Sequence, residues 1–279
     1  MDCVPILTDD QRKAIVSLYL TIAALGTILN VLSLYCQWKT RRTREFNNSA
    51  RLMASLSVCD FIDCIFVVPV FCAGYHYWKL RSDCAALKAQ AVFNNWNALY
   101  SSCLIVMITF NRYLKIVKYA RYDRIMSRRR NLIINVAAIS TSLFISLIAV
   151  VNVNSMLLVT TVLVVFTVFS IPTLYALLYK SMRANQQVTP ACQRRLRNNK
   201  VLKNLLLLTT CYLICNLPAM CLVMYALISK KKMIYFEARV THAIVCLSSV
   251  LNPVIYVLRD AVYRRTLSTL LHLNRVVAQ

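Results

Sequence analysis

Five polar side chains stand inside otherwise apolar stretches of this sequence, at spacings that give them similar depths. Asp60 lies 12 residues beyond the start of its stretch, or about 18 Å along a helix. Counted from the basic ends of their own stretches, Ser101, Ser249, Asn252 and Asn30 lie about 10–16 Å in. A carboxylate, two hydroxyls and two amides are hard oxygen ligands that suit a small cation. The same groups suit equally well a hydrogen-bond network between helices, with Asp60 protonated.

A second carboxylate, Asp63, follows Asp60 by three residues and therefore shares much of its helix face. Paired carboxylates can carry out acid–base chemistry, but no glycine-rich protease motif accompanies them. The three histidines, His76, His242 and His272, fall in an outer connection, an outer helix and the tail, so they cannot converge on one metal. We therefore expect no enzyme, and we expect Asp63 to border the ion layer or to face a ligand cavity.

The elements that position these groups are predicted to be membrane helices. Of the 279 residues, 59% are hydrophobic and only 15% are charged, and the mean hydropathy is +0.57. The apolar residues form seven stretches of the length that crosses about 30 Å of hydrocarbon, roughly 20 residues each. Lys and Arg lie between these stretches or at their ends, which excludes a basic nucleic-acid-binding domain. The predicted spans of this single domain, 1–279, are 14–38, 48–72, 89–117, 131–151, 156–179, 201–228 and 236–258.

The distribution of the 33 Lys and Arg residues predicts the orientation in the membrane. The N-terminal piece and the second, fourth and sixth connections hold 9 of them, whereas the other connections and the tail hold 24. The second set is therefore expected to face the cytoplasm, with the N-terminus outside. No cleavable signal peptide is expected, because no basic region or small-residue cleavage site flanks the first apolar stretch. We expect a multi-pass protein of the plasma membrane.

Short motifs occur in these spans in a fixed order. Asn111-Arg112-Tyr113 ends the third span, Pro218 closes Cys-Asn-Leu-Pro in the sixth, and Asn252-Pro253 begins Asn-Pro-Val-Ile-Tyr256 at the end of the seventh. With Asp60 in the second span, they resemble the rhodopsin-like (class A) G-protein-coupled receptors over the whole chain. The resemblance implies an all-α bundle of seven transmembrane helices. It also implies that residues 260–273 form an amphipathic eighth helix on the inner leaflet.

The resemblance also implies roles for single residues. Coupling to a heterotrimeric G protein and activation by outward movement of helix six are assigned to Asn111, Arg112, Tyr113, Pro218, Asn252, Pro253 and Tyr256. An allosteric sodium ion, the one cofactor expected, is assigned to Asp60, Ser101, Ser249 and Asn252. This shifts the choice between an ion site and a plain hydrogen-bond network toward sodium.

The sequence departs from the pattern of this family at several positions. Asn111 replaces the acid that usually precedes the arginine, and Asn198 replaces the helix-six residue that often pairs with it, so no ionic lock with Arg112 can form. Asn216 replaces the tryptophan that usually lies two residues before Pro218. The second extracellular loop lacks a cysteine, so the outer disulfide is expected to join Cys84 to Cys3. These departures leave open a receptor-like protein that no longer signals. A transporter or ion-conducting protein that uses both carboxylates is less favoured, because we find no inverted repeats.

The outer halves of the helices are expected to bind an extracellular ligand. The candidate contacts are Asn94, Asn95, Asn97, Asn216 and His242. A retinal Schiff base is excluded because the seventh span holds no lysine, and a monoamine is disfavoured because Asn94 occupies the position of the amine-binding acid. Subfamily features conflict: some are similar to melatonin receptors, others to melanocortin and lipid receptors. A small molecule, a lipid or a peptide remains open as the ligand.

Overall fold

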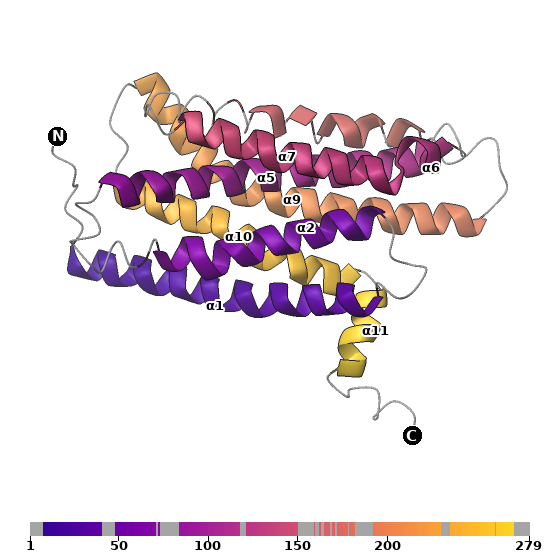
Figure 1. The fold of residues 1–279 in the computed structure, drawn as a ribbon, viewed down its shortest axis with the longest axis horizontal. Coiled ribbons are helices and arrows are strands. Elements are labelled where there is room, and N and C mark those ends of the chain that lie inside the picture. Colours follow the sequence, from indigo (N-terminus) through magenta and orange to yellow (C-terminus); the bar gives the residue numbers. More distant parts are fainter. Residues whose placement is uncertain are drawn as a thin grey trace.

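The structure, a computed structural model, describes residues 8–40, 48–70, 72, 84–117, 121–149, 192–229, 235–259 and 261–270, with parts of 159–181. Every element in these ranges is a helix. The long helices run along one axis and form a bundle (Figure 1). They are α1 (Asp9–Thr40), α2 (Asn48–Ile62), α5 (Cys84–Val117), α7 (Arg128–Ala149), α9 (Cys192–Ser229) and α10 (Tyr235–Arg259).

These helices confirm the predicted all-α fold, with bounds that differ at the ends. The sixth predicted span, 201–228, lies inside α9, which begins nine residues earlier at Cys192. The third, 89–117, begins five residues earlier at Cys84. The described parts of 159–181, where the fifth span was predicted, are also helical. Counting apolar residues underestimates such helices because their polar ends extend past the hydrocarbon.

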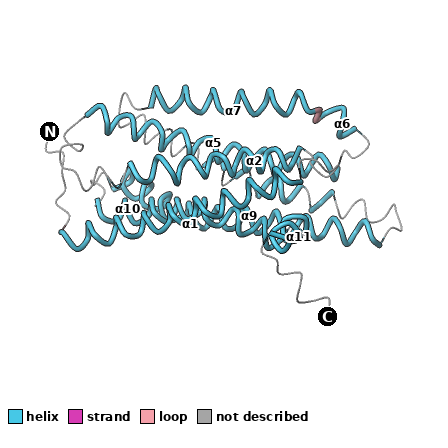
Figure 2. Tube along the Cα trace, turned by 60° about the horizontal axis from the view of Figure 1, so that its bottom comes forward, coloured by secondary structure: helices cyan, strands magenta, loops and turns pink. Residues whose placement is uncertain are grey.

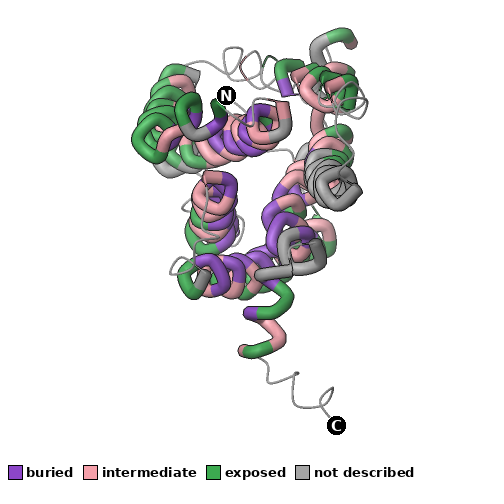
Figure 3. Tube along the Cα trace, turned by 90° about the vertical axis from the view of Figure 1, so that its right-hand side faces the viewer, coloured by how far each residue is buried: buried purple, intermediate pink, exposed green. Residues whose placement is uncertain are grey.

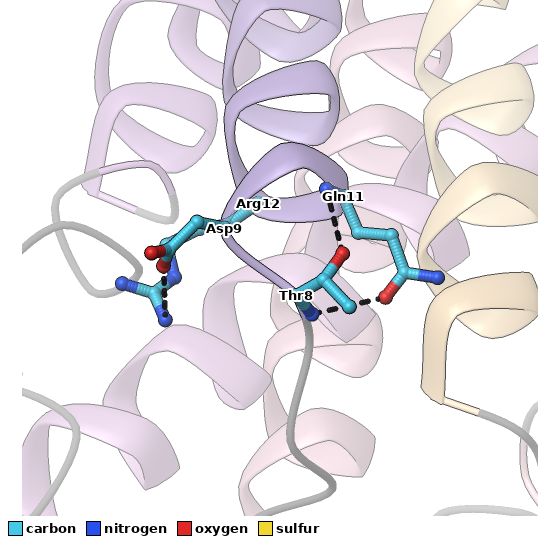
Figure 4. Close-up of polar contacts among 4 residues, drawn as sticks. All are labelled: Thr8, Asp9, Gln11 and Arg12. Carbon is cyan, nitrogen blue, oxygen red and sulfur yellow. Dashed lines mark hydrogen bonds and ion pairs between the residues drawn. The ribbon is translucent and has the colours of Figure 1, made fainter.

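The first helix begins with a reciprocal cap. The Thr8 hydroxyl accepts from the Gln11 backbone N–H at 3.2 Å, and the Gln11 side chain accepts from the Thr8 N–H at 3.1 Å (Figure 4). Asp9 and Arg12 form an ion pair at 3.3 Å in the same first turn. The cap satisfies two backbone donors that a helix start otherwise leaves open.

The outer surface of the bundle is apolar. Ile28, Leu132 and Phe144 expose 57–64% of their surface. The buried residues lie on the parts of the helices that face the inside of the bundle (Figure 3). Within the described residues, three helices have the length and composition to cross a bilayer: Asp9–Lys39, Asn48–Val70 and Arg128–Ile148. Shorter apolar helices lie at Val165–Ser181, Thr210–Leu222 and Arg239–Ile255. An exterior of this kind requires hydrocarbon as its solvent.

Two apolar clusters divide the interior along its length. The cluster nearer Arg112 includes Leu52, Leu104, Ile108, Tyr212 and Ile255 from four helices. The cluster at the opposite end joins α1 and α10 to the last part of the second span through Ile15, Tyr19, Val68, Ala243 and Val250. Buried polar groups lie between and beside these two clusters, as described below.

One turn of the second span, among the residues described, is wider than an α-helical turn. The helix α2 continues without a break into a π-helical turn, η1 (Asp63–Val67), in which the Val68 N–H donates to the Asp63 carbonyl. Gly26 of α1 lies against this turn, because a Cβ at that position would come within 3.0 Å of the Cys64 sulfur. The absence of a side chain at Gly26 therefore lets α1 approach the wide turn of the second span closely.

Two short helices lie at the Arg112 end of the bundle. The helix α6 (Tyr122–Ile125) leads directly into α7 (Figure 2). The helix α11 (Ala261–Leu270) packs on α1 and α10 and runs transverse to the long helices, away from the bundle (Figure 1). Tyr263 and Thr266 of α11 are buried and Arg264 and Arg265 are exposed, which fits the amphipathic helix predicted at 260–273.

Candidate functional site

The carboxylate of Asp60 lies at the centre of a buried polar cluster between α2 and α10. The Ser249 hydroxyl donates to one oxygen at 2.9 Å, and the Asn252 amide donates to the other at 2.9 Å. All three residues expose 4% of their surface or less. The two α10 residues are three positions apart, so both face α2, and Pro253 follows directly within the helix.

Asn30 completes this arrangement from α1. Its amide nitrogen donates to the carbonyls of Gly26 and Ser249, both at 2.9 Å. Its oxygen is buried and has no hydrogen-bond partner among the described residues. We call Asp60, Ser249, Asn252 and Asn30 the central polar cluster; it brings together four of the five side chains that depth counting placed in one layer.

The fifth residue of that layer, Ser101, lies on a different helix, α5, and does not join the cluster. Its hydroxyl is 3.5 Å from the Cys59 sulfur, and among the described residues no hydrogen bond joins it to Asp60. The Cys59 thiol also donates to the Asn97 side chain, whose amide in turn hydrogen bonds to Asp63. Asp63 is therefore buried and held by α5, whereas Asp60 is held by α10.

The central polar cluster has oxygen ligands that suit a small cation, but it lacks the ligands of a transition-metal site. Within the described part of the chain, no three His, Cys, Asp or Glu side chains group together as metal ligands. The Asp60 oxygens each accept one hydrogen bond and keep further lone pairs. The Asn30 oxygen offers another neutral ligand. Such a set of hard oxygens suits sodium, and it also suits a hydrogen-bond network between three helices.

A second polar network surrounds Asn111, one residue before Arg112. The Asn111 amide donates to the Ser49 hydroxyl at 2.7 Å, and the Tyr122 hydroxyl donates to the Asn111 oxygen at 2.8 Å. Asn111 and Ser49 are fully buried, and Tyr122 exposes only 7%. An aspartate at 111 could accept from both hydroxyls but could donate to neither. Asparagine is therefore required for the observed pair of bonds, in which residue 111 donates to Ser49 and accepts from Tyr122.

The neighbouring turn before α7 is fixed to the same helices. The Asn48 side chain donates to the Met126 carbonyl and accepts from Arg51 at 3.1 Å. Lys115 lies 5.9 Å from the Tyr122 ring centroid. The Asn111 network, defined by Asn111, Ser49 and Tyr122, thus ties α2, α5 and α6 together at this end.

The opposite half of the bundle contains a third network around His242. One ring nitrogen lies 2.6 Å from the Tyr19 hydroxyl and the other 2.8 Å from the Asn94 side chain. The Tyr19 hydroxyl also donates to the Arg239 carbonyl at 3.0 Å. This outer triad of Tyr19, His242 and Asn94 connects α1, α10 and α5, so His242 has a structural role whether or not it meets a ligand.

The other predicted ligand contacts do not join the outer triad. Asn95 is 8% exposed, and its amide nitrogen has no hydrogen-bond partner among the described residues. The Trp96 ring nitrogen is likewise buried without an acceptor in that part of the chain. The Asn216 amide donates to the Tyr212 carbonyl one turn back in α9. Two unused donors on α5 therefore remain available to an acceptor group.

The side chains of three predicted site residues are not among those that the structure describes. Tyr256 lies in α10 and Cys84 begins α5, but their side chains are outside the described set, as is Cys3. Pro218 lies inside α9 as expected, and Tyr113 packs beside the cluster of Leu114, Tyr122 and Met126. The proposed pairing of Cys3 with Cys84 thus falls outside the described residues.

Tyr19, Ser49 and Tyr122 take part in these networks without having been expected from the sequence. Tyr19 lies seven residues before Gly26 in an apolar helix, where a tyrosine gives only a weak polar signal. Ser49 lies at the start of a span and Tyr122 lies in a basic connection. Neither residue is deep enough within a predicted span to be selected as a buried polar group. A buried hydroxyl becomes visible only when its partner on another helix is known.

Comparison with known protein families gives one match. Residues 29–256 match the family model described as 7 transmembrane receptor (rhodopsin family). This range includes the central polar cluster, Asn111–Tyr113 and the outer residues Asn94 and His242. No curated protein matches the sequence.

Proposed function

Because the chain belongs to the rhodopsin family of seven-transmembrane receptors, we propose that it binds an extracellular ligand and activates heterotrimeric G proteins. The observation that carries this proposal is the arrangement around Asn111-Arg112-Tyr113, which lies at one end of the bundle beside α6 and α2. The same end carries most of the basic residues, which supports a cytoplasmic location for it and an extracellular N-terminus.

In this proposal Arg112 receives the C-terminal segment of a Gα subunit when the cytoplasmic end of α9 moves outward. Pro218 supports such a movement, because a proline inside a helix removes one backbone hydrogen bond and loosens the chain locally. An arginine suits the site because its planar guanidinium offers five donors to helix carbonyls. Asn111 fixes the neighbouring backbone through bonds to Ser49 and Tyr122.

The test is nucleotide exchange on purified Gα subunits by the purified full-length receptor in lipid nanodiscs. We expect exchange above the receptor-free rate with at least one Gα class, and its loss in Arg112→Ala. Arg265 on α11 is exposed, so Arg265→Ala serves as the matched control and should keep the nucleotide-exchange activity. No exchange with any Gα class under a broad ligand screen would refute the proposal and leave a receptor-like protein that does not signal.

We place the ligand in the half of the bundle that contains the outer triad. The unused donors of Asn95 and Trp96 support a ligand with a carbonyl or carboxylate oxygen. Asn97 lies on the same helix, α5, whereas Asn216 lies on α9 and His242 on α10. Since α10 carries no lysine within its apolar segment, a retinal Schiff base is ruled out. A ligand screen read out by nucleotide exchange, repeated with Asn95→Ala, tests this placement.

We further propose that the central polar cluster holds an allosteric sodium ion. Asp60 would supply the charge and Ser249, Asn252 and Asn30 neutral oxygens, and the ion would hold α2, α10 and α1 in the inactive arrangement. Sodium should then lower agonist affinity, and this response should disappear in Asp60→Asn. An unchanged sodium response in that variant would favour a plain hydrogen-bond network.

A further inference from the structure

The junction between α6 and α7 presents a dense group of basic side chains. Residues 121–130 contain five arginines and a single acid, Asp123. The side chains of Arg121, Arg124, Arg128 and Arg129 are all exposed. We call these four residues the arginine platform. The coupling proposal makes no use of them.

The backbone beneath the arginine platform is fixed by side-chain contacts. The fifth arginine, Arg130, donates to the Arg124 carbonyl at 2.7 Å, and its own N–H donates to the Ser127 hydroxyl at 3.3 Å. The Asn48 amide donates to the Met126 carbonyl in the middle of the turn. Because the turn is already ordered, a bound anion would not have to supply the free energy of ordering it.

The position of the arginine platform matches the headgroup level of a bilayer. The lipid-facing surface of α7 begins just beyond it, where Leu132, Ile133 and Val136 expose 64%, 57% and 53% of their surface. Leu132 is three residues after Arg129, a rise of about 4.5 Å along the helix. The arginine side chains therefore lie at the boundary between hydrocarbon and water.

We propose that the arginine platform is a docking site for inositol-lipid headgroups that carry more than one phosphate. A guanidinium binds phosphate oxygens in pairs, and a headgroup with several phosphates can contact several of these arginines at once. A lipid with a single negative charge can satisfy only one of them. The arrangement thus favours a polyvalent headgroup over the general negative charge of the leaflet.

The same junction gives a bound headgroup a route to the coupling site, a part of the inference that rests on the proposed function. Tyr122 lies between Arg121 and Arg124 in sequence, and its hydroxyl donates to Asn111, the neighbour of Arg112, at 2.8 Å. A headgroup that holds α6 in place stabilises this bond. Polyvalent inositol lipids should therefore change the rate of nucleotide exchange through Tyr122.

Binding is tested first, without a G protein, on the full-length receptor in phosphatidylcholine nanodiscs. The discs contain phosphatidylinositol bisphosphate, or phosphatidylserine at the same total charge, and lipid retention is measured by native mass spectrometry. The substitution Arg128→Gln with Arg129→Gln should weaken retention about 25-fold, since each interfacial arginine contributes about fivefold. The matched control, Arg264→Gln with Arg265→Gln on α11, should retain the lipid as the wild type does.

Three results would overturn the docking site: wild-type retention in the Arg128/Arg129 variant, equal retention of phosphatidylserine, or an equal loss in the α11 control. Free inositol trisphosphate that competes as strongly as the lipid would identify a site for soluble anions instead. Because these measurements need no G protein, they test the lipid site even if the proposed G-protein activation is refuted.

The relay is tested with Tyr122→Phe, which keeps the ring and removes the hydroxyl. This variant should retain the lipid as the wild type does, while its exchange rate no longer responds to the lipid. A lipid response equal to that of the wild type would overturn the relay and leave the docking site standing.

Discussion

Replacing Gly26 by alanine places a methyl group where the Cys64 sulfur lies, and the cost can be estimated from the packing. The new Cβ would come within 3.0 Å of that sulfur, whereas its other neighbours, Val250 and the Cys64 Cβ, lie at ordinary distances of 3.5 and 3.6 Å. To restore normal contact, α1 and η1 must separate by roughly 1 Å. Overpacking of this size costs about 1–3 kcal/mol.

The clash has a single source, so a second substitution should relieve it. Cys64→Ala removes the sulfur and leaves only contacts of 3.5 Å or more around the alanine at 26. We expect Gly26→Ala to lower the unfolding temperature by about 2–12 °C, at roughly 2–4 °C per kcal/mol. In the Cys64→Ala background the same change should lower it by much less. Intrinsic tryptophan fluorescence during heating in detergent measures all four proteins without a thiol-reactive dye.

An unfolding temperature for Gly26→Ala equal to that of the wild type would refute the close approach of α1 to η1. So would an equal loss in both backgrounds, since the cost would then not arise from the Cys64 sulfur. The double-mutant cycle separates these outcomes from the cavity that Cys64→Ala creates by itself.

Three further predictions concern the other networks. Asn111→Asp should lower basal nucleotide exchange, because the new carboxylate can pair with Arg112; unchanged or faster exchange on purified Gα would contradict this. Tyr19→Phe removes the bonds to His242 and the Arg239 carbonyl and should cost about 1–3 kcal/mol. The loss of stability is measured by thermal unfolding, with Tyr35→Phe in the same helix as the control. An equal loss in both variants would argue against the role of the outer triad. Thr8→Ala removes half of the reciprocal cap and should cost about 0.5–2 kcal/mol, visible as earlier hydrogen exchange over residues 9–12; unchanged exchange there would show that the cap contributes nothing.

The central polar cluster could largely be predicted from the sequence. A helix rises by a fixed amount per residue, so counting from the basic ends gave Asp60, Ser249, Asn252 and Asn30 similar depths. The structure joins these four by hydrogen bonds of 2.9 Å. Depth counting was sufficient because each of these residues also happens to face the interior.

Rotation about the helix axis could not be obtained in this way. Ser101 has a suitable depth, yet its hydroxyl lies beside Cys59. Which way a side chain points depends on how each helix packs on its neighbours, and in a bilayer that packing leaves only a weak hydrophobic pattern. Asp63 illustrates the same limit, because its partner Asn97 was expected to contact a ligand.

Tyr122 was missed for a different reason. It belongs to a connection whose basic residues predict topology, and nothing in the local pattern indicates that a four-residue helix will bury one of its side chains. The bond to Asn111 joins residues 11 positions apart across a turn. Only the position of α6 against α2 and α5 shows that these two residues meet.

The wide turn at Asp63–Val67 also bears on how this chain should be compared with its relatives. A π-helical turn contains one residue more than the α-helical turn it replaces. Relatives with a regular helix here would therefore match this chain residue for residue up to Ile62 and would be out of register by one beyond Val67. An alignment that confines gaps to loops would assign Val68 and Cys72 to the wrong structural positions, so the gap belongs inside the second span.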